Sequence, residues 1–236
     1  MAFWAWTRGL SWALWPGVVG LVLGLAPRAQ AQTAQEFASW TAASVRADLG
    51  SASEGPSLWY DTQVRSRSTG VQVLFRPGVA WRFNTWGSMW AGYLYTPTFP
   101  AGQGPALHEH RAWEQLQASF AFERARIAWR ARVEERFRSD GADVGGWVRP
   151  RLELDLRLGA DASVWAVLHD ELFVAFNDTD WGQRAGFDQN RAFAGLRVGA
   201  GSGVHVDVGY MNQLLNREPD AMHHVLWVSV GAVVPP

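Results

Sequence analysis

The stretches RIAWRARVEERFR (residues 126–138) and VRPRLELDLRL (residues 148–158) alternate charged and apolar residues almost one for one. This period of two is the period of a β-strand, in which successive side chains point to opposite faces. At the helical period the same residues would spread charge around the whole circumference. The alternation therefore predicts two long strands, each with one charged face and one apolar face.

The rest of residues 32–236 has the same character and shows no linker or low-complexity tract, so we expect one domain. Extended segments alternate with clusters of Gly, Asp, Asn, Ser and Pro, which is typical of a sheet or barrel. One segment, residues 163–176, is apolar, and its facing is ambiguous. The expected strands span residues 38–49, 57–67, 70–83, 87–96, 110–121, 125–138, 147–158, 163–176, 188–199, 203–213 and 222–234.

Residues 1–31 indicate an export signal. Arg8 supplies a small basic region, residues 9–26 form an apolar run broken by Pro16, and Ala29-Gln30-Ala31 fits a cleavage site. The mature chain is then expected to begin at Gln32. A membrane anchor is the rival interpretation, and a short apolar run that ends in a cleavage site disfavours it.

The composition narrows the class of protein. The chain has 236 residues, a formal net charge of -1, no cysteine, and 21 basic residues that are all arginine. Export without cysteine fits a Gram-negative envelope protein that does not depend on disulfides. A mild negative charge without a basic patch argues against nucleic acid as a partner. No apolar run of about 18 residues follows the signal, which argues against a helical membrane protein, and we expect no cofactor.

The apolar face of each strand must meet either a second protein layer or lipid. A soluble periplasmic β-sandwich has alternating strands too, but strands of ten residues exceed the usual five or six. In an outer-membrane barrel the apolar faces meet lipid and the charged faces line the lumen, and an arginine facing lipid near the midplane costs about 2–4 kcal/mol. We therefore expect an all-β, antiparallel transmembrane β-barrel. Glu114 and Glu135 fall on the lipid side, and we expect each near a membrane interface or at a bulge.

The connections between the expected strands alternate in length. The tight ones lie near 84–87, 121–125, 159–162 and 200–203. The long, polar ones lie near 97–109, 139–146, 177–187 and 214–221. Outer-membrane barrels have short periplasmic turns, longer external loops and, in single bacterial chains, an even number of strands. We therefore place the C-terminus in the periplasm and expect twelve strands, with a short extra one in residues 32–38. Ten is the alternative, if the weak first segment lies outside the barrel.

Several motifs in the second half of the chain carry a family resemblance. They are Arg130-x-Arg132-x-Glu134-x-Arg136-Phe137, Asp170-Glu171-Leu172-Phe173, Phe187-Asp188-Gln189-Asn190-Arg191, Gly209-Tyr210-Met211-Asn212-Gln213 and His224. The chain resembles the Gram-negative outer-membrane barrel family known as domain of unknown function "twenty-four-ninety", with specific motifs from about Trp113 onward. The resemblance implies an outer-membrane β-barrel and implies no activity. Such barrels usually end on an aromatic residue that the assembly machinery reads, whereas this chain ends Val233-Val234-Pro235-Pro236.

The charged faces of the two opening strands would lie side by side in the lumen. In one interpretation, the charged side chains on these faces line a pore or a polar ligand site. In the other, they neutralise one another and fill a small barrel. Eight-stranded barrels are filled by their own side chains, whereas 16–18 strands leave an open channel, so at ten to twelve strands we favour a filled or narrow lumen. The expected lumen network comprises Arg130, Arg132, Glu134, Arg136, Arg149, Arg151, Glu153, Asp155 and Arg157.

His169 and Glu171 are weak candidates for catalysis, because they share one face of their strand while Asp170 lies on the other. Barrel enzymes that modify lipids bring together a serine, a histidine and a carboxylate or amide near the outer rim. We favour a structural hydrogen-bonded network, because no elbow motif marks any of the candidate nucleophiles, Ser119, Ser163 and Ser229.

Two further clusters are weak metal candidates. His108 and His110 have the spacing to share one face of an extended segment. Asp178-x-Asp180-x-Gly182 resembles the start of a calcium loop, but its twelfth position is Gln189 instead of Glu. We favour surface loops for both, and weak Ca²⁺ bridging from the aspartates to lipopolysaccharide phosphates is an alternative hypothesis.

A polar rim is expected at the extracellular end of the barrel, where it forms either a binding vestibule or, as we favour, pairs that stabilise the loops. Its members are Asp188, Gln189, Asn190, Arg191, Asn212 and Gln213.

These patterns predict an exported outer-membrane barrel with a structural or transport-related role and a narrow charged lumen. Its expected partners are outer-membrane lipid, lipopolysaccharide and the barrel-assembly machinery. A barrel enzyme that hydrolyses or modifies a lipid is one alternative, and a soluble periplasmic β-sandwich binding protein is another.

Overall fold

The computed structural model describes residues 33–51, 54–102, 104–159, 163–199 and 203–236. The predicted signal peptide, residues 1–31, lies outside the described residues. Within the described residues, no helix is long and apolar enough to span a membrane. Eleven strands account for most of that part of the chain: β1 (Ala34–Asp48), β2 (Gly55–Arg67), β3 (Gly70–Arg82), β4 (Gly87–Pro100), β5 (Leu107–Ala121), β6 (Ala125–Arg138), β7 (Gly145–Arg157), β8 (Val164–Ala175), β9 (Gly186–Gly199), β10 (Val204–Leu215) and β11 (Ala221–Val234).

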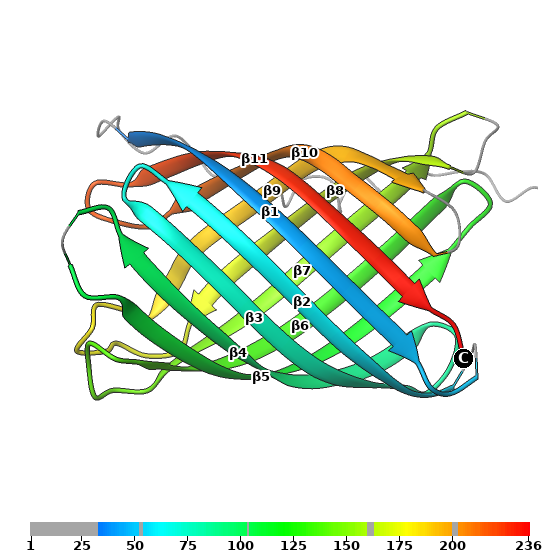
Figure 1. The fold of residues 1–236 in the computed structure, drawn as a ribbon, viewed down its shortest axis with the longest axis horizontal. Coiled ribbons are helices and arrows are strands. Elements are labelled where there is room, and N and C mark those ends of the chain that lie inside the picture. Colours follow the sequence, from blue (N-terminus) through cyan, green and yellow to red (C-terminus); the bar gives the residue numbers. More distant parts are fainter. Residues whose placement is uncertain (1–32, 52–53, 103, 160–162, 200–202) are drawn as a thin grey trace, which may run out of the picture. The chain divides into compact units, whose positions relative to one another are not determined.

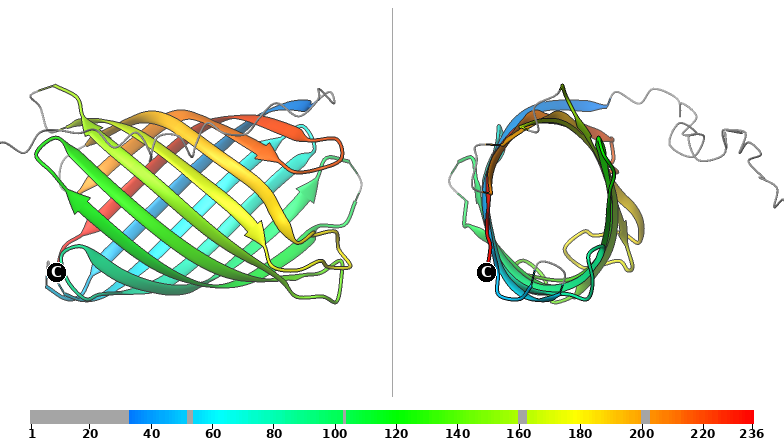
Figure 2. Two further views of the ribbon diagram at one scale, coloured as in Figure 1. Left: turned by 180° about the vertical axis from the view of Figure 1, so that it is seen from behind. Right: turned by 90° about the vertical axis from the view of Figure 1, so that its right-hand side faces the viewer.

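The eleven strands form one closed barrel in which each strand is hydrogen-bonded to its neighbours in sequence (Figure 1). Seen from its end, the barrel wall is a continuous ring of strands (Figure 2). The all-β barrel predicted from the alternation is therefore confirmed. The β-sandwich alternative is wrong, because one sheet closes on itself and leaves no second sheet to cover its apolar face.

The barrel closes through a parallel pair, β1 with β11, which runs from Ala34↔Ala221 to Ala47↔Val234. All the other neighbouring pairs are antiparallel. An odd number of strands that alternate in direction leaves the first and last pointing the same way, so a parallel closure is the geometric consequence. The expectation of twelve strands is wrong, because residues 34–38 begin β1 instead of forming a strand of their own. Ten is also wrong, because β1 pairs on both sides.

The odd strand count puts the two ends of the described chain at opposite ends of the barrel. We call the end that holds the β4–β5, β6–β7, β8–β9 and β10–β11 connections the loop end, and β1 starts there. The other end, which we call the turn end, holds the β3–β4 and β5–β6 connections and the C-terminus (Figure 1).

Side chains alternate between the lumen and the outside along every strand, as the period of two requires. The facing of the apolar strand β8, which was ambiguous from the sequence, follows the same alternation. Val167, Glu171 and Phe173 are buried inside, whereas Leu168 and Leu172 are exposed. A register shift between Phe173 and Val174 interrupts the β8–β9 ladder.

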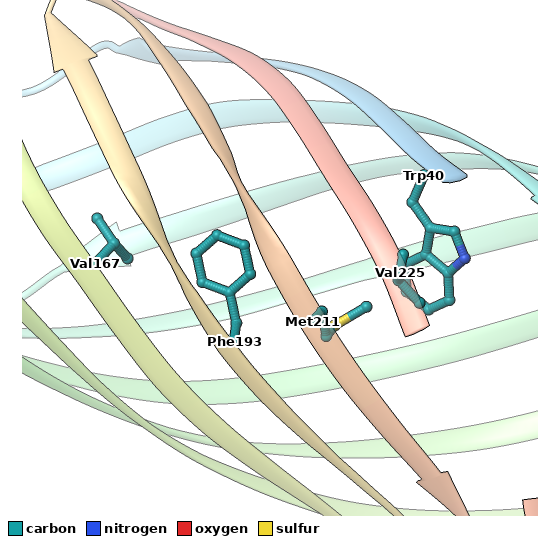
Figure 3. Close-up of a cluster of buried hydrophobic side chains, with 5 residues drawn as sticks. All are labelled: Trp40, Val167, Phe193, Met211 and Val225. Carbon is teal, nitrogen blue, oxygen red and sulfur yellow. The ribbon is translucent and has the colours of Figure 1, made fainter. Parts of the chain in front are cut away.

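The inner face also carries apolar clusters. Trp40, Val167, Phe193, Met211 and Val225 project inward from five strands, β1 and β8–β11, and pack together (Figure 3). A second cluster joins Leu74, Leu94 and Trp113, and a third joins Trp147, Phe173 and Ala175.

Glu114 and Glu135 both lie on the outer face, as their register predicted, and both are exposed. The β5–β6 ladder passes through both without a register shift, pairing Glu114 with Val133 and Ala112 with Glu135. The expected bulge is therefore wrong. Glu135 lies near the loop end of β6, whereas Glu114 lies in the middle of β5, and we have no physical account of a mid-strand carboxylate on this face.

The parallel closure can be tested by crosslinking, because the natural chain has no cysteine. Ala43 and Val230 are in register across the β1–β11 pair and both point outward. Neighbouring strands lie about 4.8 Å apart, which is within the Cα separation that a disulfide spans. We expect Ala43→Cys with Val230→Cys to form a disulfide in the folded protein, seen as a mobility shift on a non-reducing gel.

The matched control is Ala43→Cys with Leu226→Cys. Leu226 faces outward on the same strand, but it lies four residues out of register, roughly 13 Å along the strand. Equal crosslinking of both pairs, or crosslinking of neither, would contradict the parallel register.

Candidate functional site

The lumen holds the nine charged residues of β6 and β7 that the alternation predicted to share a polar face. The cross-strand register sets Arg130 opposite Arg151 and Arg132 opposite Arg149. Like charges directly opposite each other on a sheet repel. Neutralisation therefore requires carboxylates placed diagonally or on other strands, and the structure supplies them in three layers along the barrel.

The layer nearest the loop end is centred on Glu109 of β5. Its Oε1 accepts hydrogen bonds from Arg136 Nε at 2.6 Å and from Arg111 Nε at 2.9 Å. The guanidinium group of Arg136 also lies over the Trp147 ring, 3.6 Å from its centroid. A cation over an aromatic face is favourable, and more so where water is excluded.

The middle layer is built on Glu134 and Glu171. Glu134 is 1% exposed and accepts a hydrogen bond from Arg111 Nη1 at 3.0 Å and another from Arg149. Glu171, from β8, accepts hydrogen bonds from Arg130 and from Arg149 Nη2, the latter at 2.9 Å. Arg149 thus bridges the two carboxylates.

The layer toward the turn end gathers acids from β7 and β10. Arg126 Nη2 lies 2.7 Å from Glu153 Oε1. Arg197 donates from Nε to Asp207 at 2.8 Å and from Nη1 to Asp155 at 3.1 Å. Of the nine predicted residues, Arg157 has a different kind of partner, since its guanidinium group lies over the Trp165 ring at 5.1 Å.

The β8–β9 connection folds onto the network at the loop end. Gln183 is 4% exposed, and its Oε1 accepts a hydrogen bond from Arg136 Nη1 at 2.9 Å. The Trp181 ring lies under the guanidinium groups of Arg136 and Arg138, at 4.8 and 4.9 Å. Trp181 Nε1 also donates to the Asp143 carbonyl at 2.8 Å. The connection thereby covers the arginines on the β6–β7 side of the lumen.

Asp180 fixes this connection to the β6–β7 connection. Its carboxylate accepts hydrogen bonds from the backbone N–H groups of Ala142 at 2.8 Å and Asp143 at 3.2 Å. These bonds favour the ionised form and lower the pKa of Asp180 below its usual value. Glycine at position 145 makes room for this connection, since a Cβ there would lie 2.5 Å from the Trp181 ring.

With this geometry described, comparison with known proteins assigns the chain to a family. A family profile described as "Protein of unknown function (DUF2490)" matches residues 37–223. The chain belongs to the DUF2490 family. An uncharacterized protein of Methylorubrum extorquens is 32% identical over 208 residues, which cover 84% of this chain and 88% of that protein. No solved structure matches the chain. The resemblance drawn from the motifs is therefore confirmed.

The catalytic candidates of this DUF2490 chain both face the lumen. Glu171 is bound by arginines, and the ring of His169 stacks on Phe193 with centroids 4.8 Å apart. His169 Nδ1 is buried without a hydrogen-bond partner. Among the described residues, Ser119, Ser163 and Ser229 therefore make no hydrogen bond to His169 Nδ1.

The metal candidates lie apart and have other partners. His108 and His110 lie in β5 and not in a surface loop, so that expectation is wrong. Both point outward and contact Tyr95 and Tyr93 through their Nδ1 atoms. Asp178 accepts a hydrogen bond from the Ala185 N–H at 2.7 Å. In the part of the chain that the structure describes, no three His, Asp or Glu side chains gather in a way that would hold a metal ion.

The residues expected at the polar rim divide between the two faces. Gln189, Arg191 and Gln213 are buried in the lumen, and Gln213 Nε2 donates to Gln189 Oε1 at 2.5 Å. Asp188 is buried at the register shift and pairs with Arg217 at 3.1 Å.

Asn190 and Asn212 belong to the outer face instead. The Nδ2 of Asn190 donates to both Asp170 oxygens at 3.0 Å, and the Nδ2 of Asn212 donates to the Tyr210 hydroxyl at 3.4 Å. Strand alternation therefore prevents the six residues from forming one vestibule.

Several lumen residues were not singled out from the sequence. Arg65, Arg76, Arg111, Arg197 and Asp207 lie on strands whose period of two was already clear, so a count of charges on each polar face would have found them. Gln183 gave no such signal, because it lies in an irregular connection and its burial depends on tertiary packing.

The buried network predicts that substitution of Glu134 destabilises the barrel and that substitution of the adjacent Glu135 does not. Glu134→Gln removes the carboxylate that neutralises Arg111 and Arg149, and breaking a buried ion pair typically costs about 3–5 kcal/mol. Glu135 faces outward and is exposed, so Glu135→Gln is the matched control and should not destabilise. Denaturant unfolding of the two variants in detergent micelles measures both free energies. Equal effects of the two substitutions would show that the lumen network does not stabilise the barrel.

Proposed function

We propose that this chain is an integral outer-membrane β-barrel, exported through a cleaved signal peptide, with a narrow lumen and a structural or transport-related role. Its partners in this proposal are outer-membrane lipid, lipopolysaccharide and the barrel-assembly machinery. The observation that carries the proposal is the arrangement of the wall, which is charged inside and apolar outside.

The apolar exterior supports a lipid environment. One leucine on each of five strands is between 43 and 58% exposed, although all five lie well inside their strands. Soluble monomers rarely expose contiguous apolar patches larger than a few hundred Å², whereas a bilayer needs such a band around a barrel. The five are Leu116, Leu152, Leu168, Leu196 and Leu226.

Aromatic side chains gather toward both ends of the outer face, as in the girdles of membrane barrels. Toward the loop end, the Phe37 and His224 rings stack 5.1 Å apart and Tyr95 contacts His108 Nδ1 at 2.8 Å. At the turn end the Trp86 and Phe120 rings stack 6.0 Å apart. Amphipathic rings are favourable at the headgroup level because one end is apolar and the other polar.

The side chains inside the lumen favour a closed or narrow interior over an open pore. The three layers of ion pairs cross the interior, and the β8–β9 connection covers the network at the loop end. Any transport would therefore pass a narrow, charged route. Among the residues that the structure describes, no contact of His169 or Glu171 favours the alternative of a lipid-modifying enzyme.

Placing an arginine on the outer wall tests the membrane proposal. We expect Leu226→Arg to destabilise the barrel in a bilayer by about 2–4 kcal/mol, because the guanidinium group would enter hydrocarbon. Leu49→Arg is the control: Leu49 is also 58% exposed but lies in the β1–β2 connection. Loss of heat-modifiable gel mobility, followed with increasing denaturant in liposomes, measures the difference. Equal stability of the two variants, or recovery of the wild type in the soluble periplasmic fraction, would contradict the proposal.

The same liposome-folded protein tests the narrow lumen. In planar bilayers we expect no large stable unit conductance, and a porin-like conductance would show that the lumen is open.

A further inference from the structure

The lumen contains a cavity of about 110 Å³ whose lining is strongly cationic. Seven of its lining residues are arginines and two are carboxylates, Glu171 and Asp207. We call this cavity the arginine chamber. Its arginines come from β2, β3, β6, β7 and β9, so the closed barrel brings together guanidinium groups that are far apart in the sequence.

Two of the chamber's arginines have no carboxylate partner among the described residues. Arg65 donates hydrogen bonds to Gln63 Oε1 at 2.7 Å and to Gln72 Oε1 at 3.3 Å, both neutral acceptors. Arg191 is 9% exposed and contacts two rings, Trp40 at 5.0 Å and Phe173 at 4.4 Å. The guanidinium groups of Arg65 and Arg191 both lie over the Trp40 ring, at 4.0 and 5.0 Å from its centroid.

The carboxylates near the chamber form their ion pairs with other arginines. Glu134 forms ion pairs with three arginines, Arg111, Arg132 and Arg149. Glu171 forms ion pairs with Arg130 and Arg149. Seven guanidinium groups and two carboxylates line the chamber, so its described lining carries an excess of positive charge. Buried charges in proteins are normally paired, and an anionic ligand would supply the missing partners.

Unused donors of chamber arginines accompany this charge. Several of their Nε atoms are buried and have no hydrogen-bond partner among the described residues, and buried polar groups are normally satisfied. Each of these Nε–H groups can donate a hydrogen bond to an oxyanion, and guanidinium groups bind carboxylates and phosphates through two parallel hydrogen bonds. The residues concerned are Arg76, Arg130, Arg149, Arg151 and Arg191.

One side of the chamber is apolar. Trp40, Val167, Phe193 and Met211 belong to both the chamber lining and the buried cluster drawn in Figure 3. A ligand that fills the chamber would therefore place its charge against the arginines and an apolar body against these side chains.

A series of cavities leads from the chamber toward the turn end. The chamber shares Arg130 and Arg151 with a second cavity on β5–β7, and that cavity shares Gln117 and Arg126 with a third. The third cavity reaches the β3–β4 connection and the C-terminal Pro236, and it also contains Arg46 and Arg82. Arginines outnumber the carboxylates Glu153 and Asp48 along this route, which favours the approach of an anion.

We propose that the arginine chamber binds a small organic anion, a carboxylate or phosphate attached to an apolar body, which enters from the turn end. The oxyanion accepts hydrogen bonds from Arg191 and neighbouring guanidinium groups, and the apolar body packs against Trp40, Phe193 and Met211. The proposal requires the folded barrel but not the membrane, so it is tested in detergent and does not fail if the membrane proposal fails.

Titration calorimetry on the detergent-folded full chain tests the site with benzoate, phenyl phosphate and inorganic phosphate. We expect benzoate or phenyl phosphate to bind, and the neutral analogue benzamide to give no heat. Phenyl phosphate should bind more tightly than inorganic phosphate, because only the former has a body for the apolar wall. Equal affinity for the two phosphates would overturn the role of that wall.

Arg191→Gln is the decisive variant. It removes a buried cation that has no carboxylate partner, so we expect binding to weaken at least tenfold while resistance to denaturant stays the same or increases. Arg65→Gln should behave in the same way, which keeps the test valid if one variant does not fold. Arg138→Gln, which removes the partner of Asp140 outside the chamber, is the control and should bind as the wild type does. No binding of any anion to the wild type, or unchanged binding in both chamber variants, would overturn the proposal.

Discussion

The arginines on the inner faces of β6 and β7 set the constraint on which the rest of the barrel depends. The register places Arg130 and Arg132 opposite two other arginines, so the two strands cannot balance their own charge by direct pairing. Carboxylates from the flanking strands β5 and β8 form ion pairs with arginines of these two strands: Glu109 with Arg136, and Glu171 with Arg149. A closed barrel satisfies this requirement because it turns every polar face toward one interior and every apolar face outward.

The strand facing could be predicted because it depends only on a local period of two. It was clear for β6 and β7, where charge and apolar residues alternate, and ambiguous for β8, where residues on both faces are apolar. Partners across the lumen could not be predicted in the same way. The bond between Arg149 and Glu171 and the burial of Gln183 depend on how strands distant in sequence are brought together.

The number of strands in the barrel also could not be predicted from local sequence, because it depends on how the first and last strands pair. The expected segments were eleven, and a general rule about bacterial barrels led to twelve or ten. The parallel pairing of β1 with β11 removes the need for an even number. Nothing local in residues 34–48 reveals that pairing, because a strand's own alternation is the same whichever direction its neighbour runs. A consequence is that the chain enters the barrel wall at the loop end and leaves it at the turn end.

The account rests on an exterior that meets lipid, and cysteine scanning along β11 in liposomes tests this most directly. Leu226, Val228 and Val230 face outward on this strand, and Glu218 lies exposed in the β10–β11 connection. Single cysteines at the three outward positions should resist a charged, water-soluble maleimide in the folded protein and react with it only after denaturation, because the thiolate is the reactive form and does not form in hydrocarbon. A cysteine at position 218 should react readily in the folded protein. If the water-soluble reagent labels the three outward positions as fast as position 218, the wall does not face lipid and the account is wrong.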